Sequence, residues 1–196
     1  MSTLRDQNIQ QLIKIDEVNT FVETGTYRGD TTAWAAEHFT NVYSIELGDT
    51  LYRRCVQRFA NQKNVHLING DSVTSLARLL PTIKERAFLW LDAHYSSRDT
   101  EKGHISVPLL EELLVIASHP INNHIILIDD YRLFGWKNAS GEEDWSAVTE
   151  DKIKEILRSI NPRYRLFGAR DIYMATTTDK LTLYGLLRSF LYRLGY

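Results

Sequence analysis

Short apolar runs alternate with stretches of helical periodicity along most of the chain. Five of the runs predict strands, at residues 19–23, 42–46, 65–68, 87–91 and 125–128. The spacing of apolar positions between and after them predicts helices, at residues 31–39, 49–60, 72–80, 105–118 and 149–159. The runs at 87–91 and 125–128 are apolar throughout, which is typical of central strands covered on both faces. Two later runs, 164–167 and 172–175, flank a Gly-Ala-Arg-Asp turn and predict a hairpin.

This order of elements predicts the fold class. We expect an α/β fold: a doubly wound, mostly parallel seven-stranded sheet with helices on both faces and a C-terminal antiparallel hairpin. A chain of 196 residues is most simply one domain, residues 1–196. Residues 1–18 are predicted to form a leading helix packed on the domain, and residues 181–196 a basic C-terminal helix. The arginines and tyrosines of that helix leave two roles open, contact with a membrane or partner and packing on its own domain.

Composition and charge are those of an ordinary globular protein, with 43% hydrophobic residues, 24% charged residues and a net charge of −2. This balance gives no reason to expect a nucleic-acid partner. No run approaches the roughly 20 apolar residues of a membrane span, and no signal peptide is recognisable. The single cysteine, Cys55, excludes an intrachain disulfide, and a cytoplasmic location is expected.

The stretch from Phe21 to Thr32 joins the first strand to the first helix through Gly25 and Gly29. Glycine suits a backbone that turns sharply or lets a ligand approach, and the start of the next helix, at Thr31, offers free N–H groups. These features predict a cofactor-binding loop, with an ordinary strand–turn–helix as the alternative. The loop lacks the Gly-Lys-Ser/Thr end of a P-loop, and Tyr27 replaces the middle glycine of the dinucleotide fingerprint.

An acidic residue stands where each of the five predicted parallel strands ends: Glu23, Glu46, Asp71, Asp92 and the pair Asp129–Asp130. The ligand crevice of an open α/β sheet lies outside the carboxyl ends of its strands, so we expect these acids along one edge. Each acid alone could instead cap a helix or form a turn. Glu46 is placed to accept hydrogen bonds from a ribose, and Asp71 is placed to bind a base amine, which together describe an adenosine. Ser72 is the predicted cap of the next helix.

The acids of the fourth and fifth strands predict a different kind of ligand. Asp92, Asp129 and Asp130 would repel one another if they were buried together without compensation. Oxygen-only ligands suit a hard divalent cation, Mg²⁺ first with Mn²⁺ or Ca²⁺ as alternatives, rather than Zn²⁺. His94 follows two residues after Asp92 and is a candidate base, substrate contact or extra ligand, or else a loop histidine bonded to backbone.

From Phe21 through Ala175 the chain resembles the class I S-adenosylmethionine-dependent methyltransferases. The stretch Glu23-Thr24-Gly25-Thr26-Tyr27-Arg28-Gly29 is similar to their first motif, and the resemblance implies that it holds the methionine part of the cofactor. The resemblance also implies that Glu46 binds the ribose and that Asp71 and Ser72 lie beside the adenine.

Two further stretches, Leu91-Asp92-Ala93-His94-Tyr95 and Leu127-Ile128-Asp129-Asp130, resemble the metal-binding pattern of catechol-type O-methyltransferases and, more closely, of macrocin-type sugar O-methyltransferases. The resemblance implies Asp92, Asp129 and Asp130 as metal ligands, with Asp92 also near the cofactor and in the catalytic centre. The chain departs from the catechol type because it has Asp-Asp after the fifth strand and no lysine after Asp92 until Lys102. His94 or an aspartate would then take the proton.

These features together predict an S-adenosylmethionine-dependent, divalent-metal-assisted O-methyltransferase that acts on a small hydroxylated acceptor, such as the vicinal diol of a sugar, with a catechol second. Loop residues that could line the acceptor are Tyr95, Arg132, Phe134 and Trp136. The pocket is expected to be shallow or completed by a second subunit, so a homodimer is one expectation. Three other functions stay open: a nicotinamide-dependent oxidoreductase, another metal-dependent enzyme such as an iron oxygenase, and a cofactor-binding protein without chemistry.

Overall fold

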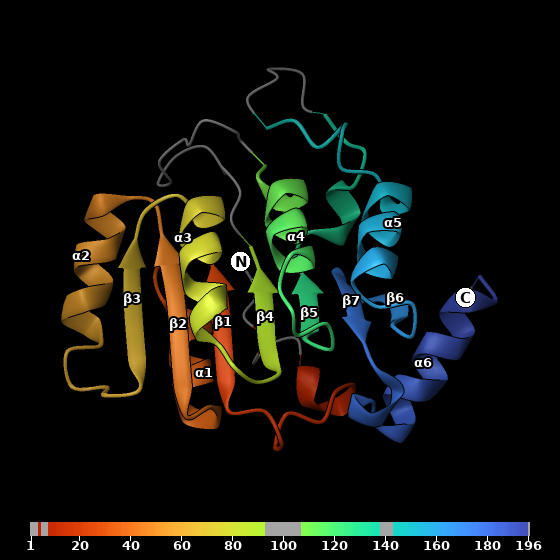
Figure 1. The fold of residues 1–196 in the computed structure, drawn as a ribbon, viewed down its shortest axis with the longest axis horizontal. Helices are drawn as coiled ribbons and strands as arrows, with labels where there is room; N and C mark the ends of the chain where they lie inside the picture. Colours follow the sequence, from red (N-terminus) through yellow and green to blue (C-terminus); the bar gives the residue numbers. More distant parts are fainter. Residues whose placement is uncertain (1–3, 5–7, 93–106, 138–142, 196) are drawn as a thin grey trace.

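The structure is a computed structural model that describes residue 4 and residues 8–92, 107–137 and 143–195. Within these residues one sheet of seven strands has the order β3-β2-β1-β4-β5-β7-β6 (Figure 1). The strands are β1 (Thr20–Thr24), β2 (Asn41–Glu46), β3 (Val65–Asn69), β4 (Ala87–Leu91), β5 (Ile125–Ile128), β6 (Arg165–Ala169) and β7 (Ile172–Thr176). Strands β1 to β5 are parallel, and β7 is antiparallel to both β5 and β6. The predicted sheet with its C-terminal hairpin is therefore confirmed.

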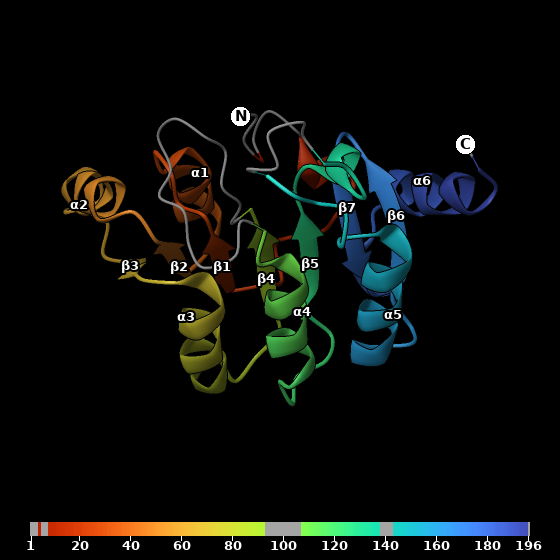
Figure 2. The same ribbon diagram turned by 90° about the horizontal axis from the view of Figure 1, so that it is seen from above.

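Helices lie on both faces of this sheet, as predicted. They are α1 (Asp30–His38), α2 (Asp49–Arg58), α3 (Ser72–Leu79), α4 (Leu109–Ala117), α5 (Glu150–Ile160) and α6 (Leu183–Arg193), with short 3-10 helices η1 (Ile9–Gln11), η2 (Leu80–Thr82), η3 (Tyr131–Leu133) and η4 (Thr178–Lys180). Helices α3, α4 and α5 cover one face, α1 and α2 lie on the other, and α6 projects beside β6 at the end of the sheet (Figure 2). No helix in the described ranges is long and apolar enough to cross a membrane.

Strand β4 shows why the continuous apolar runs are central strands. Its side chains alternate between the two faces, as strand geometry requires. Leu89 and Leu91 belong to the core beneath α3, α4 and α5, whereas Phe88 and Trp90 belong to the core on the α1 side. Phe88 stacks on Phe21 of β1 with ring centroids 5.6 Å apart. Both faces of the strand are therefore covered by apolar side chains.

The leading segment differs from the predicted helix over residues 1–18. In its described part the only helical turn is η1, which Asn8 precedes in the left-handed conformation at φ 50°. Ile13 then forms an antiparallel bridge with Leu181, close to the start of α6. Ile15 and Val18 are buried as well, so the segment buries side chains as an extended chain and not along one helical stripe. The contact that decides its conformation is distant in sequence.

The hairpin turn is tighter than the predicted four residues. Arg170 and Asp171 both have positive φ, 54° and 67°, as the two central residues of a type I′ turn require. The turn returns the chain to the edge where β5 ends, because the Tyr131 N–H donates to the Asp171 carbonyl at 3.0 Å. The hairpin thereby supports the segment that follows β5.

Candidate cofactor and metal site

The loop between β1 and α1 is held in a strained left-handed conformation. Gly25, Tyr27 and Gly29 have φ values of 85°, 51° and 80°, a region that side-chain-bearing residues rarely adopt. The N–H of Gly25 donates to the Ile45 carbonyl at 2.9 Å, which folds the loop over β2. A Cβ on Gly29 would lie only 2.7 Å from a ring carbon of Phe59. Glycine at this position therefore meets both a backbone and a packing requirement.

Glu23 lies beneath this loop, at the end of β1. Its side chain is 1% exposed, and its Oε2 accepts hydrogen bonds from the hydroxyls of Thr32 at 2.5 Å and Ser44 at 2.6 Å. Burial raises the pKa of Glu23 to about 8, although the two hydroxyls oppose the shift. The carboxyl group is therefore mostly protonated at neutral pH and joins β1, β2 and α1 under the loop.

Glu46, at the end of β2, fixes the opposite side of the loop. Its Oε2 accepts the Tyr27 N–H at 2.7 Å, and its Oε1 accepts the Gly48 N–H at 2.8 Å. Each carboxylate oxygen has two lone pairs, so these bonds leave acceptor capacity for further donors such as ribose hydroxyls. Glu46 can thus shape the loop and still serve the predicted ligand.

At the end of β3 the residue that caps the next helix is not the predicted serine. Asp71, and not Ser72, caps α3, because its Oδ1 accepts the Thr74 N–H at 2.9 Å. An aspartate at this position satisfies a free N–H at the helix start, and its charge suits that end of the helix dipole. Ser72 is buried in the first turn of α3.

Glu112 on α4 is a site residue that the sequence reasoning missed. It is 1% exposed, and burial raises its pKa to about 7, with the hydroxyls of Ser72 and Thr24 opposing the shift and Asp71 and Asp92 adding to it. Its Oε1 has no hydrogen-bond partner among the residues that the structure describes. A signal for it was present, because Leu109, Glu112, Leu113 and Ile116 recur at helical spacing and share the buried face.

The three predicted aspartates lie together at the ends of β4 and β5. One carboxylate oxygen from each of Asp92, Asp129 and Asp130 lies within 4.8 Å of the others. Adjacent parallel strands cause this, because the Asp92 N–H donates to the Thr24 carbonyl and the Asp129 N–H to the Leu91 carbonyl, each at 3.1 Å. Asp129 and Asp130 are buried. An all-oxygen set of this kind fits a hard divalent cation.

Arg132 supplies positive charge at the edge of this acid cluster. Its Nη1 lies 2.6 Å from Oδ1 of Asp130 and also contacts Asp171 of the hairpin turn. The Arg132 side chain is 61% exposed, so solvent screens its charge. It therefore offsets only part of the repulsion among three carboxylates.

A small cavity adjoins the cluster. Its volume is about 10 Å³, comparable to the space that one water molecule needs. It is lined by Leu91, Asp92, Val107, Leu109, Glu112, Ile128, Asp129 and Trp145. Glu112 and two of the predicted metal ligands thus line the same small cavity.

The remaining predicted residues fall into two groups. His94 and Tyr95 lie outside the described residues. Phe134 packs on Tyr131 with ring centroids 5.1 Å apart, which gives it a packing role, whereas Trp136 is partly exposed. The ends of β1 to β5 all point to the upper edge of the sheet in Figure 1, where the glycine loop and the acid cluster both lie.

Comparison with known proteins supports the fold. No family model matches the chain, and no curated protein matches it. Solved structures do match, among them the SAH-bound methyltransferase PaMTH1 of Podospora anserina, with a TM-score of 0.56, 16% identity, 82% of this chain and 72% of that chain covered. Human methyltransferase-like protein 13 with SAH matches with a TM-score of 0.57, 13% identity and coverages of 89% and 80%.

An rRNA methylase from Streptococcus thermophilus also matches, with a TM-score of 0.50, 16% identity and coverages of 83% and 89%. Identities this low show the fold alone. The chain therefore has the class I methyltransferase fold.

Proposed function

We propose that the chain is an S-adenosylmethionine-dependent O-methyltransferase in which Asp92, Asp129 and Asp130 hold a divalent cation. The observation that carries the proposal is the placement of two ligand-binding features at one sheet edge. One is the left-handed loop from Gly25 to Gly29 with Glu46 beside it. The other is an acid cluster whose oxygens lie within 4.8 Å of one another. The SAH-bound neighbours share the fold and support the choice of cofactor.

On this proposal the loop and the acids after β2 and β3 bind the cofactor. The backbone of Thr24, Gly25, Tyr27 and Gly29, with Thr31 at the start of α1, surrounds the methionine part, while Glu23 braces the loop from below. Glu46 accepts from the ribose hydroxyls, and Asp71 and Ser72 lie beside the adenine. The cofactor supplies an electrophilic methyl group, so the role of these residues is to hold it in reach of the acceptor.

The acid cluster has the complementary role of preparing the acceptor. A divalent cation held there would lower the pKa of an acceptor hydroxyl and fix its orientation. Mg²⁺ is the first candidate, with Mn²⁺ or Ca²⁺ as alternatives. An acceptor with two neighbouring oxygens suits such a centre, so vicinal hydroxyls of a sugar come first and a catechol second. His94 is the proposed base, and Asp92 lies between the two halves of the site.

Calorimetric titration of S-adenosylmethionine into the protein, with and without Mg²⁺, tests both halves of the proposal. We expect cofactor binding by the wild type in both conditions. Asp129→Asn should keep cofactor binding and weaken Mg²⁺ binding by on the order of tenfold or more, because a charged ligand becomes neutral. Asp49→Asn, an exposed aspartate on α2, is the matched control and should change neither affinity.

Absence of cofactor binding in every condition would overturn the methyltransferase proposal, and binding of a nicotinamide dinucleotide in its place would identify an oxidoreductase. Equal Mg²⁺ affinity of Asp129→Asn and wild type would overturn the metal centre alone. Turnover should then be measured on matched acceptors with vicinal and isolated hydroxyls and on an RNA fragment. Faster turnover of the RNA fragment than of the small acceptors would show that the acceptor is RNA and not a small molecule. A cytoplasmic location and a homodimer remain predictions from the sequence.

A further inference from the structure

Helix α6 presents large apolar side chains to solvent. Eight large apolar side chains are exposed in the described part of the chain, and five of them lie in or just after this helix. They are Leu183, Tyr184, Leu187, Phe190 and Leu194, with exposed fractions between 47% and 88%. Leu183, Leu187, Phe190 and Leu194 recur at spacings of four, three and four, so they share one side of the helix. Exposed apolar side chains that gather on one side of a helix, and are not scattered singly, indicate an interaction surface.

The exposure follows from how α6 is anchored. The opposite side of the helix carries small residues, and a Cβ on Gly185 would collide with the carbonyl oxygen of Leu12. Ser189 on the same side is buried, and Thr182 caps the helix by accepting the Gly185 N–H at 3.0 Å. The small residues let the helix approach the domain closely and leave its apolar face outward. The fold thus fixes the exposed face in place.

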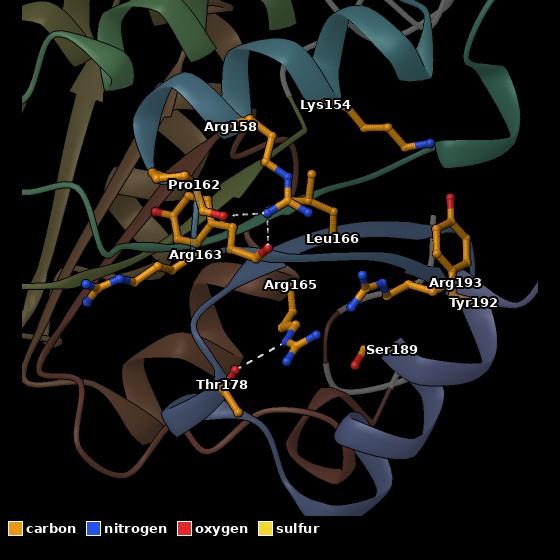
Figure 3. A pocket seen from close by; sticks show the side chains of 11 residues that line it. Lys154, Arg158, Pro162, Arg163, Arg165, Leu166, Thr178, Ser189, Tyr192 and Arg193 are labelled. Carbon is orange, nitrogen blue, oxygen red and sulfur yellow. Dashed lines mark hydrogen bonds between the residues drawn. The ribbon is translucent and has the colours of Figure 1, made fainter.

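Arginines lie at the margins of the exposed face, and further cations lie in a cleft on the packed side of α6. Helix α6 has no acidic residue, and neither Arg188 nor Arg193 has an ion-pair partner among the described residues. A cleft of about 750 Å³ between α5, β6 and α6 is lined by five cations and no acid (Figure 3). The five are Lys154, Arg158, Arg163, Arg165 and Arg193.

Three of these cations have neighbours that fix or screen them. Arg158 donates to the carbonyls of Pro162 at 2.9 Å and Tyr164 at 2.6 Å. Lys154 pairs with Glu150 at 2.6 Å, and the Nε of Arg165 donates to the hydroxyl of Thr178 at 3.3 Å. Arg165 and Arg193 extend into the space between the helices in Figure 3. The cleft is therefore positive although the whole chain has a net charge of −2.

We propose that the exposed apolar face of α6, with Arg188 and Arg193 at its margins, forms a docking surface for a membrane rich in anionic phospholipid. Apolar side chains on one side of a helix with arginines beside them match a helix that lies in the membrane interface. The leucines and Phe190 would enter the boundary of the acyl chains, while Arg188 and Arg193 reach the lipid phosphates. The absence of acids on α6 removes the repulsion that an anionic surface would otherwise meet.

Other occupants fit these observations less well. Two helices of 11 residues span only about 16 Å, so pairing them would bury well under the roughly 800 Å² per partner of a stable dimer. A second copy would also bring the same positive charges to the contact. An RNA strand would use the cations, but its phosphates gain nothing from a leucine stripe. A membrane uses both features.

Docking through α6 would also orient the candidate site. The hydroxyl of Tyr192 lies 2.8 Å from the hydroxyl of Tyr131, which directly follows Asp130, and donates to Glu150 at 2.5 Å. These bonds join the docking helix to the segment after β5. The inference does not depend on the proposed methyl transfer, because lipid binding requires neither cofactor nor metal.

Flotation of the full chain with lipid vesicles tests the proposal. We expect binding to vesicles of phosphatidylcholine with phosphatidylglycerol, and at least about tenfold weaker binding to phosphatidylcholine alone. The double variant Leu187→Ser/Phe190→Ser should weaken binding by about tenfold or more. Leu114→Ser on α4, a leucine that is 58% exposed on another helix, is the matched control and should bind as the wild type does. Circular dichroism of each variant checks the fold.

A second pair of variants keeps the test decisive if the serine variant does not fold. Arg188→Gln/Arg193→Gln should weaken binding to anionic vesicles by about fivefold per arginine and reduce its dependence on salt. Failure to bind anionic vesicles, or equal binding by all variants, would overturn the proposal. So would a dimer in sedimentation velocity that Leu187→Ser/Phe190→Ser dissociates, or an RNA oligonucleotide that binds the cleft while vesicles do not.

Discussion

The buried carboxyl of Glu23 makes the stability of this protein depend on pH in a way that one substitution should remove. Burial raises the pKa of Glu23 from 4.5 to about 8. The difference corresponds to on the order of 5 kcal/mol between the protonated and ionised forms. Because the pKa is raised in the folded state, this stability is fully present below about pH 4.5 and is lost as the pH rises through about 8.

The variant Glu23→Gln keeps an oxygen that Thr32 and Ser44 can donate to and cannot ionise. We expect urea unfolding of the wild type to show a free energy of unfolding that falls between pH 4.5 and 8, and a flatter curve for the variant. The variant should be the more stable protein above pH 8. Glu155→Gln, an exposed glutamate on α5, should follow the wild type.

A second buried acid also lowers the free energy of unfolding as the pH rises, so it limits how much of this pH dependence Glu23→Gln can remove. Burial raises the pKa of Glu112 to about 7, so Glu23→Gln should remove only part of the slope and Glu23→Gln/Glu112→Gln most of it. Parallel curves for the wild type and Glu23→Gln would refute the reasoning, because they would mean that Glu23 takes up protons equally in the folded and unfolded chains.

Three further predictions use other parts of the molecule. Gly29→Ala should lower the free energy of unfolding by about 2–4 kcal/mol, because the position has a left-handed φ and the new Cβ would contact Phe59. Gly135→Ala, at a left-handed position with no neighbour within reach, should lower it by only about 1 kcal/mol. Equal losses for the two variants in urea unfolding would exclude a cost from the contact with Phe59. Burial lowers the pKa of His124 from 6.5 to about 4, so its contribution to stability is present above pH 6.5 and lost as the pH falls through 4, and His124→Gln should flatten this acid limb in thermal unfolding. Arg132→Gln should raise Mg²⁺ affinity about two- to fivefold in calorimetry by removing a competing charge, and lower affinity would show that the arginine orients the cluster.

Much of the site could be predicted because parallel strands bring distant residues to one edge. Asp92 and Asp129 are far apart in sequence, yet each follows an apolar run, and neighbouring parallel strands place their ends together. The same argument predicted that Glu46, at the end of β2, lies beside the glycine loop. The prediction required only the order of strands and helices along the chain and the rule that crossovers between parallel strands are right-handed. What followed from backbone topology was therefore predictable.

Side-chain partners across elements were not predictable in the same way. The leading segment has apolar residues that suit a helix, but its bridge to Leu181 can be known only once the distant C-terminal segment is in place. Glu112 follows another acid in the first turn of α4, where negative charge interacts favourably with the helix dipole. An exposed role at the helix start explains such an acid equally well, so the sequence did not reveal that Glu112 is buried. Where a local pattern fits two conformations or two environments, contacts with distant segments decide between them.

The net charge of the chain is a poor guide to the partners that it binds, because electrostatic interactions act only over a short range in salt solution. Salt limits the interaction between exposed charges to about 8–10 Å, so a ligand responds to the patch it touches and not to the total. Acids concentrate at the ends of β4 and β5, whereas cations concentrate between α5, β6 and α6. A total of −2 is the sum of these regions and describes neither. The net charge therefore does not describe the cationic cleft, and the RNA experiment tests whether this cleft binds a polyanion.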